Sequence, residues 1–335
     1  MRPLRALCLL LLLRPGTAAA LPAPCPAGNW LNLSPENIPR QESAVAGLDG
    51  RVYAVGGLAG RSNATEIYDI ASDTWTSGPD FPVETDHGWA VALDGRIYVG
   101  GGSGNRVFTT APGAAGWTEV ASSRYVHGGT PAAGVIEGRI YVAGGTGGEM
   151  TGNEAEVYDP AGNTWATVAS MACARNHTAG GVIDGKLYVA GGRPGSQDCV
   201  EAYDPLANTW IRRAPMPTAR SGVAGAVVGH CLYVFGGEGN AADVHGIFHQ
   251  VEAYDPKADA WTSLPPMRTG RHGIVAAVIG RAVYLPGGAT REGLGVTGIN
   301  EVYVVEEPPD PTARPPVAPP RGRGRRAPLP PLPPR

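Results

Sequence analysis

The sequence predicts an all-β fold, a six-bladed β-propeller of four-stranded antiparallel blades. Three observations predict it. A strand that ends in a glycine pair recurs six times, a turn followed by a tryptophan recurs after it, and the composition suits tight turns. The 335 residues include 49 Gly and 32 Pro, and only 17% are charged, which favours many turns over long helices.

The strand with the glycine pair sets the repeat length. GRVYAVGG at 50–57 returns five times, at steps of 43 to 51 residues. Its tyrosines are Tyr53, Tyr98, Tyr141, Tyr188, Tyr233 and Tyr284. The β-branched and aromatic residues indicate a strand that packs in the core. The glycine pair suits a strand end where the backbone needs a positive φ or a close approach.

A turn and two more strands complete each repeat. EIYDIASDTW at 66–75 has near-copies at 156–165, 201–210 and 252–261, each with Trp seven residues after Tyr. Asp-Pro followed by Asn or Asp between two strands indicates a turn, because Pro presets φ and the Asx side chain caps its own backbone. Another strand, such as HTAGGVID at 177–184, precedes each glycine pair. The four strands of one repeat therefore form one blade.

The sixth repeat lacks its last strand. The third strand, at 300–306, is followed by EPPDP and by no tryptophan. The missing strand matches NWLNLSP at 29–35, where Trp30 stands 45 residues before Trp75. We therefore expect the N-terminal strand at 29–34 to complete the last blade, so that the propeller spans 29–306. Closing the ring removes exposed strand edges.

The two ends of the chain differ from the repeats. Residues 1–20 have a basic start, the apolar run ALCLLLLL and an A-x-A site at Ala20, which predicts a secretory signal peptide and a secreted or periplasmic protein. A short leader at 21–28 follows. The tail at 307–335 holds 12 Pro and 6 Arg and is predicted to be disordered. No segment is long and apolar enough to predict a transmembrane span.

Cleavage near Ala20 leaves an even number of cysteines. They are Cys25, Cys173, Cys199 and Cys231. In an exported chain four cysteines permit two disulfides without fixing their pairing. Their spacing matches no zinc pattern. Because Cys231 lies in a strand typical of the core, we expect it to be a buried free thiol.

Charge and motifs exclude several classes of function. Between the predicted signal peptide and the tail, 18 basic and 28 acidic residues leave a net charge of −10, which argues against a nucleic-acid partner. The sequence has no HExxH, no GxSxG and no phosphate-binding loop. It therefore predicts no metal, no cofactor and no catalytic residue, and it favours a binding protein over an enzyme.

The repeated motifs resemble kelch repeats over about residues 29–306. The resemblance rests on the tyrosine strand with its glycine pair, the YDP turn and the tryptophan seven residues after the tyrosine. WD-repeat propellers are similar in plan, but their Trp-Asp strand ending is absent. The resemblance implies that partner recognition is the function. We therefore expect an exported binding module that recognises a protein or glycan through its loop face and channel mouth.

The kelch resemblance also places a set of candidate ligand-binding residues. Arginines stand thirteen residues before four of the tyrosines, and histidines stand near the corresponding positions. They are Arg40, Arg175, Arg220, Arg271, His87, His127, His177 and His272. In a kelch propeller this column leads into the innermost strand and would ring one mouth of the channel. Converging guanidiniums would bind carboxylates, and histidines would add hydrogen bonds.

Other interpretations remain open at this point. The arginines could instead satisfy carbonyls and acidic side chains between blades. If they do bind a ligand, the chain is also similar to periplasmic sialic-acid epimerases, in which Glu42, Asp86 or a histidine would shuttle protons while arginines hold the sugar carboxylate. Copper radical oxidases share these blades, but six blades and the cysteine positions argue against them. Trp89 would either fill the core or stack on a ligand.

Overall fold

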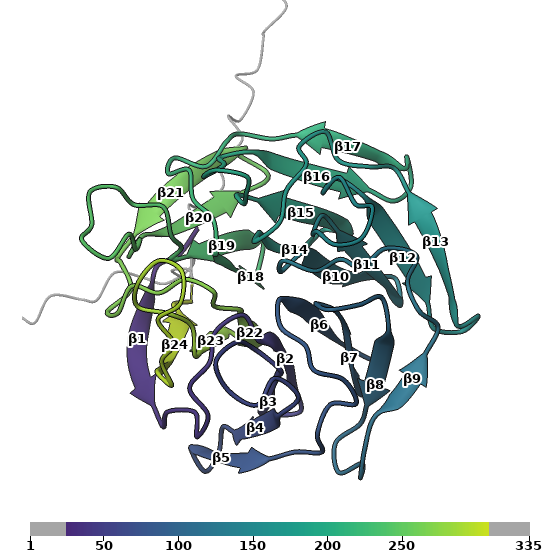
Figure 1. The fold of residues 1–335 in the computed structure, drawn as a ribbon. Helices are drawn as coiled ribbons and strands as arrows, with labels where there is room; N and C mark the ends of the chain where they lie inside the picture. The colour runs from purple at the N-terminus through teal and green to yellow at the C-terminus, as the bar shows by residue number, and fades with distance from the viewer. Residues whose placement is uncertain (1–24, 308–335) are drawn as a thin grey trace, which may run out of the picture.

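The computed structural model describes residues 25–307 and confirms the predicted fold. Six four-stranded antiparallel sheets surround a central axis as blades (Figure 1). From the axis outward, blade 1 consists of β2 (Ala44–Leu48), β3 (Arg51–Val55), β4 (Thr65–Asp69) and β5 (Thr74–Ser77). Blade 2 consists of β6 (Gly88–Leu93), β7 (Arg96–Gly101), β8 (Val107–Thr110) and β9 (Thr118–Val120). Blade 3 consists of β10 (Ala132–Ile136), β11 (Arg139–Ala143), β12 (Ala155–Asp159) and β13 (Thr164–Val168). Blade 4 consists of β14 (Ala179–Ile183), β15 (Lys186–Ala190), β16 (Val200–Asp204) and β17 (Thr209–Arg212). Blade 5 consists of β18 (Ala224–Val228), β19 (Cys231–Phe235), β20 (Val251–Asp255) and β21 (Ala260–Leu264). Blade 6 consists of β22 (Ala277–Ile279), β23 (Ala282–Pro286), β24 (Asn300–Val305) and β1 (Gly28–Leu33).

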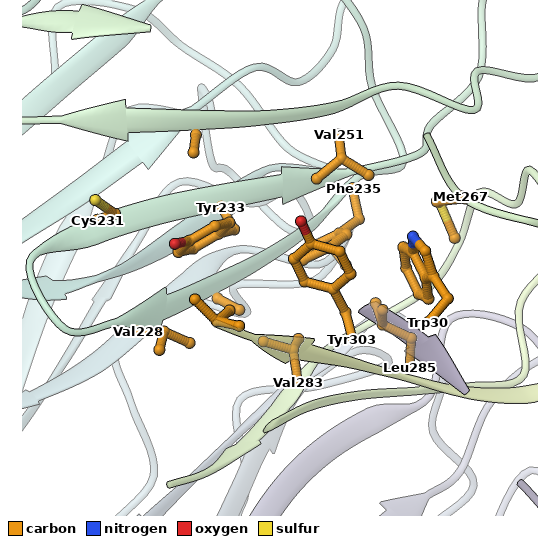
Figure 2. Packing of buried hydrophobic residues seen from close by; sticks show 14 of the residues in the cluster. Trp30, Val228, Cys231, Tyr233, Phe235, Val251, Met267, Val283, Leu285 and Tyr303 are labelled. Atoms are coloured by element: carbon orange, nitrogen blue, oxygen red, sulfur yellow. The ribbon is translucent and has the colours of Figure 1, made fainter. Parts of the chain in front are cut away.

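The N-terminal strand closes the ring, as the orphan tryptophan motif predicts. β1 pairs antiparallel with β24, placing Trp30 opposite Tyr303, and the two ends of the fold lie side by side (Figure 1). The indole of Trp30 packs against Tyr303 and against Phe235 of blade 5, with ring centroids 4.9 and 5.8 Å apart (Figure 2). β1 therefore completes blade 6 and also contributes to the core between blades 5 and 6.

A disulfide joins the segment before β1 to blade 5. Cys25 is bonded to Cys231, 206 residues away, and the Tyr233 hydroxyl donates a hydrogen bond to the carbonyl of Pro26. The prediction of a free thiol at Cys231 is therefore wrong. Its partner reaches it only because ring closure brings the N-terminus across β19. Cys173 and Cys199 form a second disulfide.

The repeated turn residues connect one blade to the next. The Trp75 indole donates to the carbonyl of Ser34, and Trp117, Trp165, Trp210 and Trp261 make the same kind of bond to the preceding blade. Asp73 has a φ of 52° and accepts hydrogen bonds from the Tyr68 hydroxyl and the Ser34 amide. The YDP motif and its tryptophan thus hold blades together.

The tyrosine and glycine-pair columns have the core role that was predicted. All six tyrosines of the second strands are buried. Gly56 has a φ of 67°, and a Cβ there would lie 2.3 Å from the carbonyl oxygen of Thr85 in the next blade. Only glycine lets consecutive blades approach this closely.

The predictions for the chain ends concern segments that lie largely beyond the described region. The predicted signal peptide at 1–20, residues 21–24 of the leader at 21–28 and nearly all of the tail at 307–335 lie outside the described residues. Within 25–307, no helix has the length and hydropathy needed to cross a membrane.

Candidate functional site

The four predicted arginines lie inside the blades. Arg40, Arg175, Arg220 and Arg271 are at most 1% exposed. Each guanidinium pairs with a glutamate on the third strand of its own blade, namely Glu66, Glu201, Glu252 and Glu301. Each also donates to backbone carbonyls of its blade. The prediction that these side chains ring the channel mouth is wrong, because each guanidinium is buried and paired with a glutamate of its own blade.

The other two blades show that this arginine and glutamate form a structural unit. Blade 2 lacks both residues and has Thr85 and Phe108 at the two positions, both buried. In blade 3, His127 replaces the arginine, and its Nε2 lies 3.1 Å from Glu156. Removing one member of a buried ion pair leaves an uncompensated charge. The two positions therefore change together, and His127 belongs to this buried set rather than to the mouth.

A different set of residues encircles the axis, and in the four blades with an arginine it stands two positions after that arginine. We call it the axial ring, and it consists of Glu42, His87, Thr130, His177, Gly222 and Gly273. All six have a positive φ, between 50° and 64°. The amides of five of them donate to the carbonyl of the ring residue in the preceding blade. These bonds run from Glu42 to Gly273 (2.7 Å), from His87 to Glu42 (2.8 Å), from Thr130 to His87 (2.8 Å), from Gly222 to His177 (3.1 Å) and from Gly273 to Gly222 (3.0 Å).

Glu42 lies at the centre of this ring. Its Oε2 accepts a 2.7 Å hydrogen bond from the Thr130 hydroxyl of blade 3. Its Oε1 lies 3.8 Å from Nε2 of His87 in blade 2 and 3.8 Å from Nε2 of His177 in blade 4. A single side chain of blade 1 can reach three other blades only at the axis. The two imidazoles lie edge to face, with centroids 5.0 Å apart.

The pKa values of the two histidines at the mouth are shifted in opposite directions. Burial raises the pKa of Glu42, but His177, His87 and the Thr130 hydrogen bond outweigh it and lower the pKa below 4.5. Burial lowers the pKa of His177 to about 4. Burial also lowers the pKa of His87, but the hydrogen bond that His87 donates to Asp86 and the charge of Glu42 raise it overall. His87 therefore takes up a proton more readily than His177 does.

His272 lies at the rim of the mouth. Its Nε2 lies 2.9 Å from the carbonyl of Arg291, and its Nδ1 lies 3.2 Å from Glu238 Oε2. Glu238 also pairs with Arg193, whose side chain is 39% exposed. Of the eight predicted residues, His87, His177 and His272 therefore reach the mouth, while the four arginines and His127 do not.

The channel below the mouth is too narrow for a large ligand. It holds a cavity of about 90 Å³ lined by small side chains such as Ala132, Gly180 and Gly225. A Cβ on Gly225 would lie 2.4 Å from the amide of Gly180 in the neighbouring blade. Trp89 is 3% exposed and packs edge to face on Trp165, so it fills the core. A ligand of the size of a sugar or a peptide therefore does not fit inside the channel.

A groove that the repeat motifs do not reveal lies beside the mouth. The loops at 236–250 and 287–299 join the second and third strands of blades 5 and 6. Between them a cavity of about 570 Å³ is lined by His245, Arg291, Leu294 and Ala59 of blade 1, among others. Leu294 is 56% exposed. The one signal in the sequence is the 51-residue step from Tyr233 to Tyr284, the longest of the five, which indicates an insertion.

Comparison with known proteins supports the same architecture. A solved structure of YjhT superimposes with a TM-score of 0.66 over 80% of this chain and 96% of that one, at 20% identity. The kelch-like protein terF of Aspergillus terreus is 28% identical over 298 residues, which cover 85% of this chain and 56% of the relative. Kelch-like protein 15 of Danio rerio is 33% identical over 76 residues, covering 22% of this chain and 13% of the relative.

Two family models match the repeats. The KLHDC2/KLHL20/DRC7 Kelch-repeats domain matches residues 118–288, and the Kelch motif matches residues 39–82. The chain spans about half the length of the fungal relative and a smaller part of the zebrafish one. The larger match covers half of the chain and agrees with the blades, turns and tryptophans described above. This chain belongs to the kelch-repeat family.

Proposed function

We propose that this chain is an exported binding module that recognises a protein or glycan partner through the loop face and channel mouth of the propeller. The observation that carries the proposal is the groove beside the mouth. It combines exposed apolar and cationic side chains on the two longest loops of the described region, next to a polar mouth. Such a mixture is typical of recognition surfaces rather than of a folded core.

The groove residues have no structural task comparable to that of the blade residues. Leu294 and Val244 are 56% and 90% exposed, one on each loop. Arg291 is exposed as well, although its side chain donates to the carbonyl of Leu294. An exposed leucine beside a free guanidinium edge suits a ligand with an apolar body and a carboxylate, such as an acidic peptide or a carboxylated sugar.

Export is supported by the two disulfides. Cys25–Cys231 and Cys173–Cys199 use all four cysteines of the described residues. Structural disulfides persist in oxidising compartments, outside the cytosol. A direct check is to express the full chain in secreting cells and to identify the mature N-terminus by mass spectrometry. Cleavage near Ala20 and oxidised cysteines are expected, whereas an intact N-terminus with free thiols would contradict export.

Binding is tested with the full chain on an array of carboxylated glycans, neutral glycans and acidic peptides. We compare the parent with Leu294→Ser and with Ile211→Ser. Ile211 is a matched control, because it is 53% exposed but lies on the outer strand β17, away from the loop face. The proposal expects Leu294→Ser to lose at least about tenfold in affinity and Ile211→Ser to bind like the parent. Equal losses in both variants, or no bound probe, would contradict it.

A second candidate function is epimerisation or mutarotation of a carboxylated sugar. One observation favours it: the Glu42 carboxylate stands between two imidazoles at the mouth, which is an arrangement able to accept and return a proton. The buried arginines cannot hold the sugar carboxylate, so that role would fall to Arg193. One-dimensional NMR of N-acetylneuraminic acid anomers tests this function. Faster anomer exchange with the parent and not with Glu42→Gln would support it.

A further inference from the structure

We propose that Glu42, His87 and His177 form a binding site for a divalent first-row transition-metal ion, such as Zn²⁺, at the axis of the propeller. The site is independent of whether the loop face binds a partner. Oε1 of Glu42 and one ring nitrogen of each histidine lie within 4.8 Å of one another. Two imidazoles and one carboxylate are a donor set used for zinc and for non-haem iron, with further positions left open.

Hydrogen bonds at the Nδ1 atoms of both histidines orient the imidazoles so that their Nε2 atoms face Glu42. Nδ1 of His177 lies 2.5 Å from Oδ1 of Asn176, and Nδ1 of His87 contacts a carboxylate oxygen of Asp86. Both partner atoms are acceptors, so each Nδ1 carries the proton and donates it. The Nε2 atom that faces Glu42 is then left with a lone pair. Imidazoles that bind metals are held by such partners in the same way.

The carboxylate is held in the complementary orientation. Thr130 donates to Oε2 of Glu42, which fixes the side chain and leaves Oε1 facing both imidazoles. The Oε1–Nε2 separations of 3.8 Å are too long for hydrogen bonds. Ligand atoms around a zinc ion lie about 3.0–3.4 Å apart, with bonds of about 2.1 Å. A contraction of about half an ångström would therefore bring Oε1 to a zinc-bound separation from each Nε2 atom, and the bound cation would accept the lone pairs of all three ligand atoms.

The backbone of these three residues, like that of Thr130, lies in the left-handed region. Glu42, His87 and His177 adopt φ values of 57°, 56° and 54°, while the equivalent positions of blades 5 and 6 are Gly222 and Gly273. Left-handed φ is unfavourable for residues with a Cβ and is concentrated at functional positions. The side chain of His87 is 24% exposed, so the ion would be reached from the mouth. The remaining coordination positions would face the same opening and could hold water or an anionic ligand group.

The test is metal binding by the untagged full chain after dialysis against a chelator. Zn²⁺ is titrated by calorimetry, and the Co²⁺ complex is examined by visible and X-ray absorption spectroscopy. His87→Asn, His177→Asn and Glu42→Gln remove one ligand each. Asparagine tolerates the left-handed backbone, and glutamine can still accept the Thr130 hydrogen bond. His249→Asn, at an exposed position of a loop on the same face but outside the groove lining, is the matched control.

We expect one ion per chain and a Co²⁺ spectrum with two imidazole ligands. The zinc affinity should fall at least about 100-fold in each ligand variant, while His249→Asn binds zinc like the parent. Circular dichroism and the metal-free melting temperature establish that the variants are folded. A stoichiometry well below one would overturn the proposal. So would folded ligand variants that bind zinc as tightly as the parent, because the ion would then bind elsewhere.

Discussion

An arginine and the residue two positions after it face different parts of this molecule. Arg40 points into its blade and pairs with Glu66, whereas Glu42 points to the axis and contacts three other blades. The first column repeats in four blades because the same internal ion pair lies in each of them. The second varies around the ring, since only one cluster is built there. At this site, variation between repeats is the better guide to function.

The buried pair in blade 5 can be tested by a double-mutant cycle that copies blade 2. Arg220→Thr leaves Glu252 buried without its partner and is expected to cost about 3–5 kcal/mol. Arg220→Thr combined with Glu252→Phe reproduces the residues of Thr85 and Phe108. We expect the double variant to lose at least about 1 kcal/mol less unfolding free energy than the two single variants lose together, as measured by urea unfolding. Strictly additive losses would mean that the two residues are not a unit.

Glu36 predicts a pH dependence of stability. It stands where blades 4 to 6 have the buried methionines Met171, Met216 and Met267. Burial raises its pKa from 4.5 to about 8, although Arg40 opposes the shift. Between these values the folded state keeps a proton that the unfolded state has lost. Its contribution to stability is therefore complete below pH 4.5 and is lost as the pH rises toward 8, by at most about 1.4 kcal/mol per pH unit.

Glu36→Gln removes this titration, because the neutral amide resembles the protonated acid. From pH 5 to pH 8.5 the melting temperature of the parent is expected to fall relative to that of Glu36→Gln, as measured by calorimetry at each pH. Two parallel curves would show that Glu36 does not titrate in this range. The reverse slope would show that its pKa is lowered in the folded state.

At the scale of the element, strands and turns follow from the sequence almost completely. The repeat of the tyrosine strand predicts the blades. The tryptophan motif at Trp30, which has no glycine-pair strand before it, predicts the strand that closes the ring. Local spacing does not give contacts between distant segments. Cys25 meets Cys231 only after β1 has docked on β24, so no pattern within either repeat predicts that bond.

The two disulfides should contribute unequally to stability. In the chain-entropy model a cross-link stabilises more when it closes a longer loop. Cys25–Cys231 spans 206 residues and Cys173–Cys199 spans 26, a difference of about 2 kcal/mol. We expect Cys25→Ser/Cys231→Ser to melt lower than Cys173→Ser/Cys199→Ser in differential scanning calorimetry. The opposite order would show that the N-terminal segment stays docked without its disulfide.

At the scale of the whole molecule, the sequence predicts the location of a site more accurately than the residues that form it. The tyrosine alignment locates the end of the innermost strands, and His87, His177 and His272 are found there. Glu42 was identified only as a proton donor or acceptor serving the arginines, because its contacts depend on three blades that converge around one axis. The direction in which each side chain points follows from backbone φ values that no repeat spacing reveals.

The most direct test compares a loop-face variant with a blade variant in one ligand-dependent melting experiment. The full-length parent, Arg291→Ala and Arg220→Thr are melted alone and with N-acetylneuraminic acid, galactose or an acidic peptide. We expect a carboxylate-bearing probe to raise the melting temperature of the parent and of Arg220→Thr by similar amounts. We also expect Arg220→Thr to start from a lower value, and Arg291→Ala to keep its baseline but to lose the shift. An unchanged baseline in Arg220→Thr together with a lost ligand shift would contradict this expectation, and would place recognition at the arginine column instead.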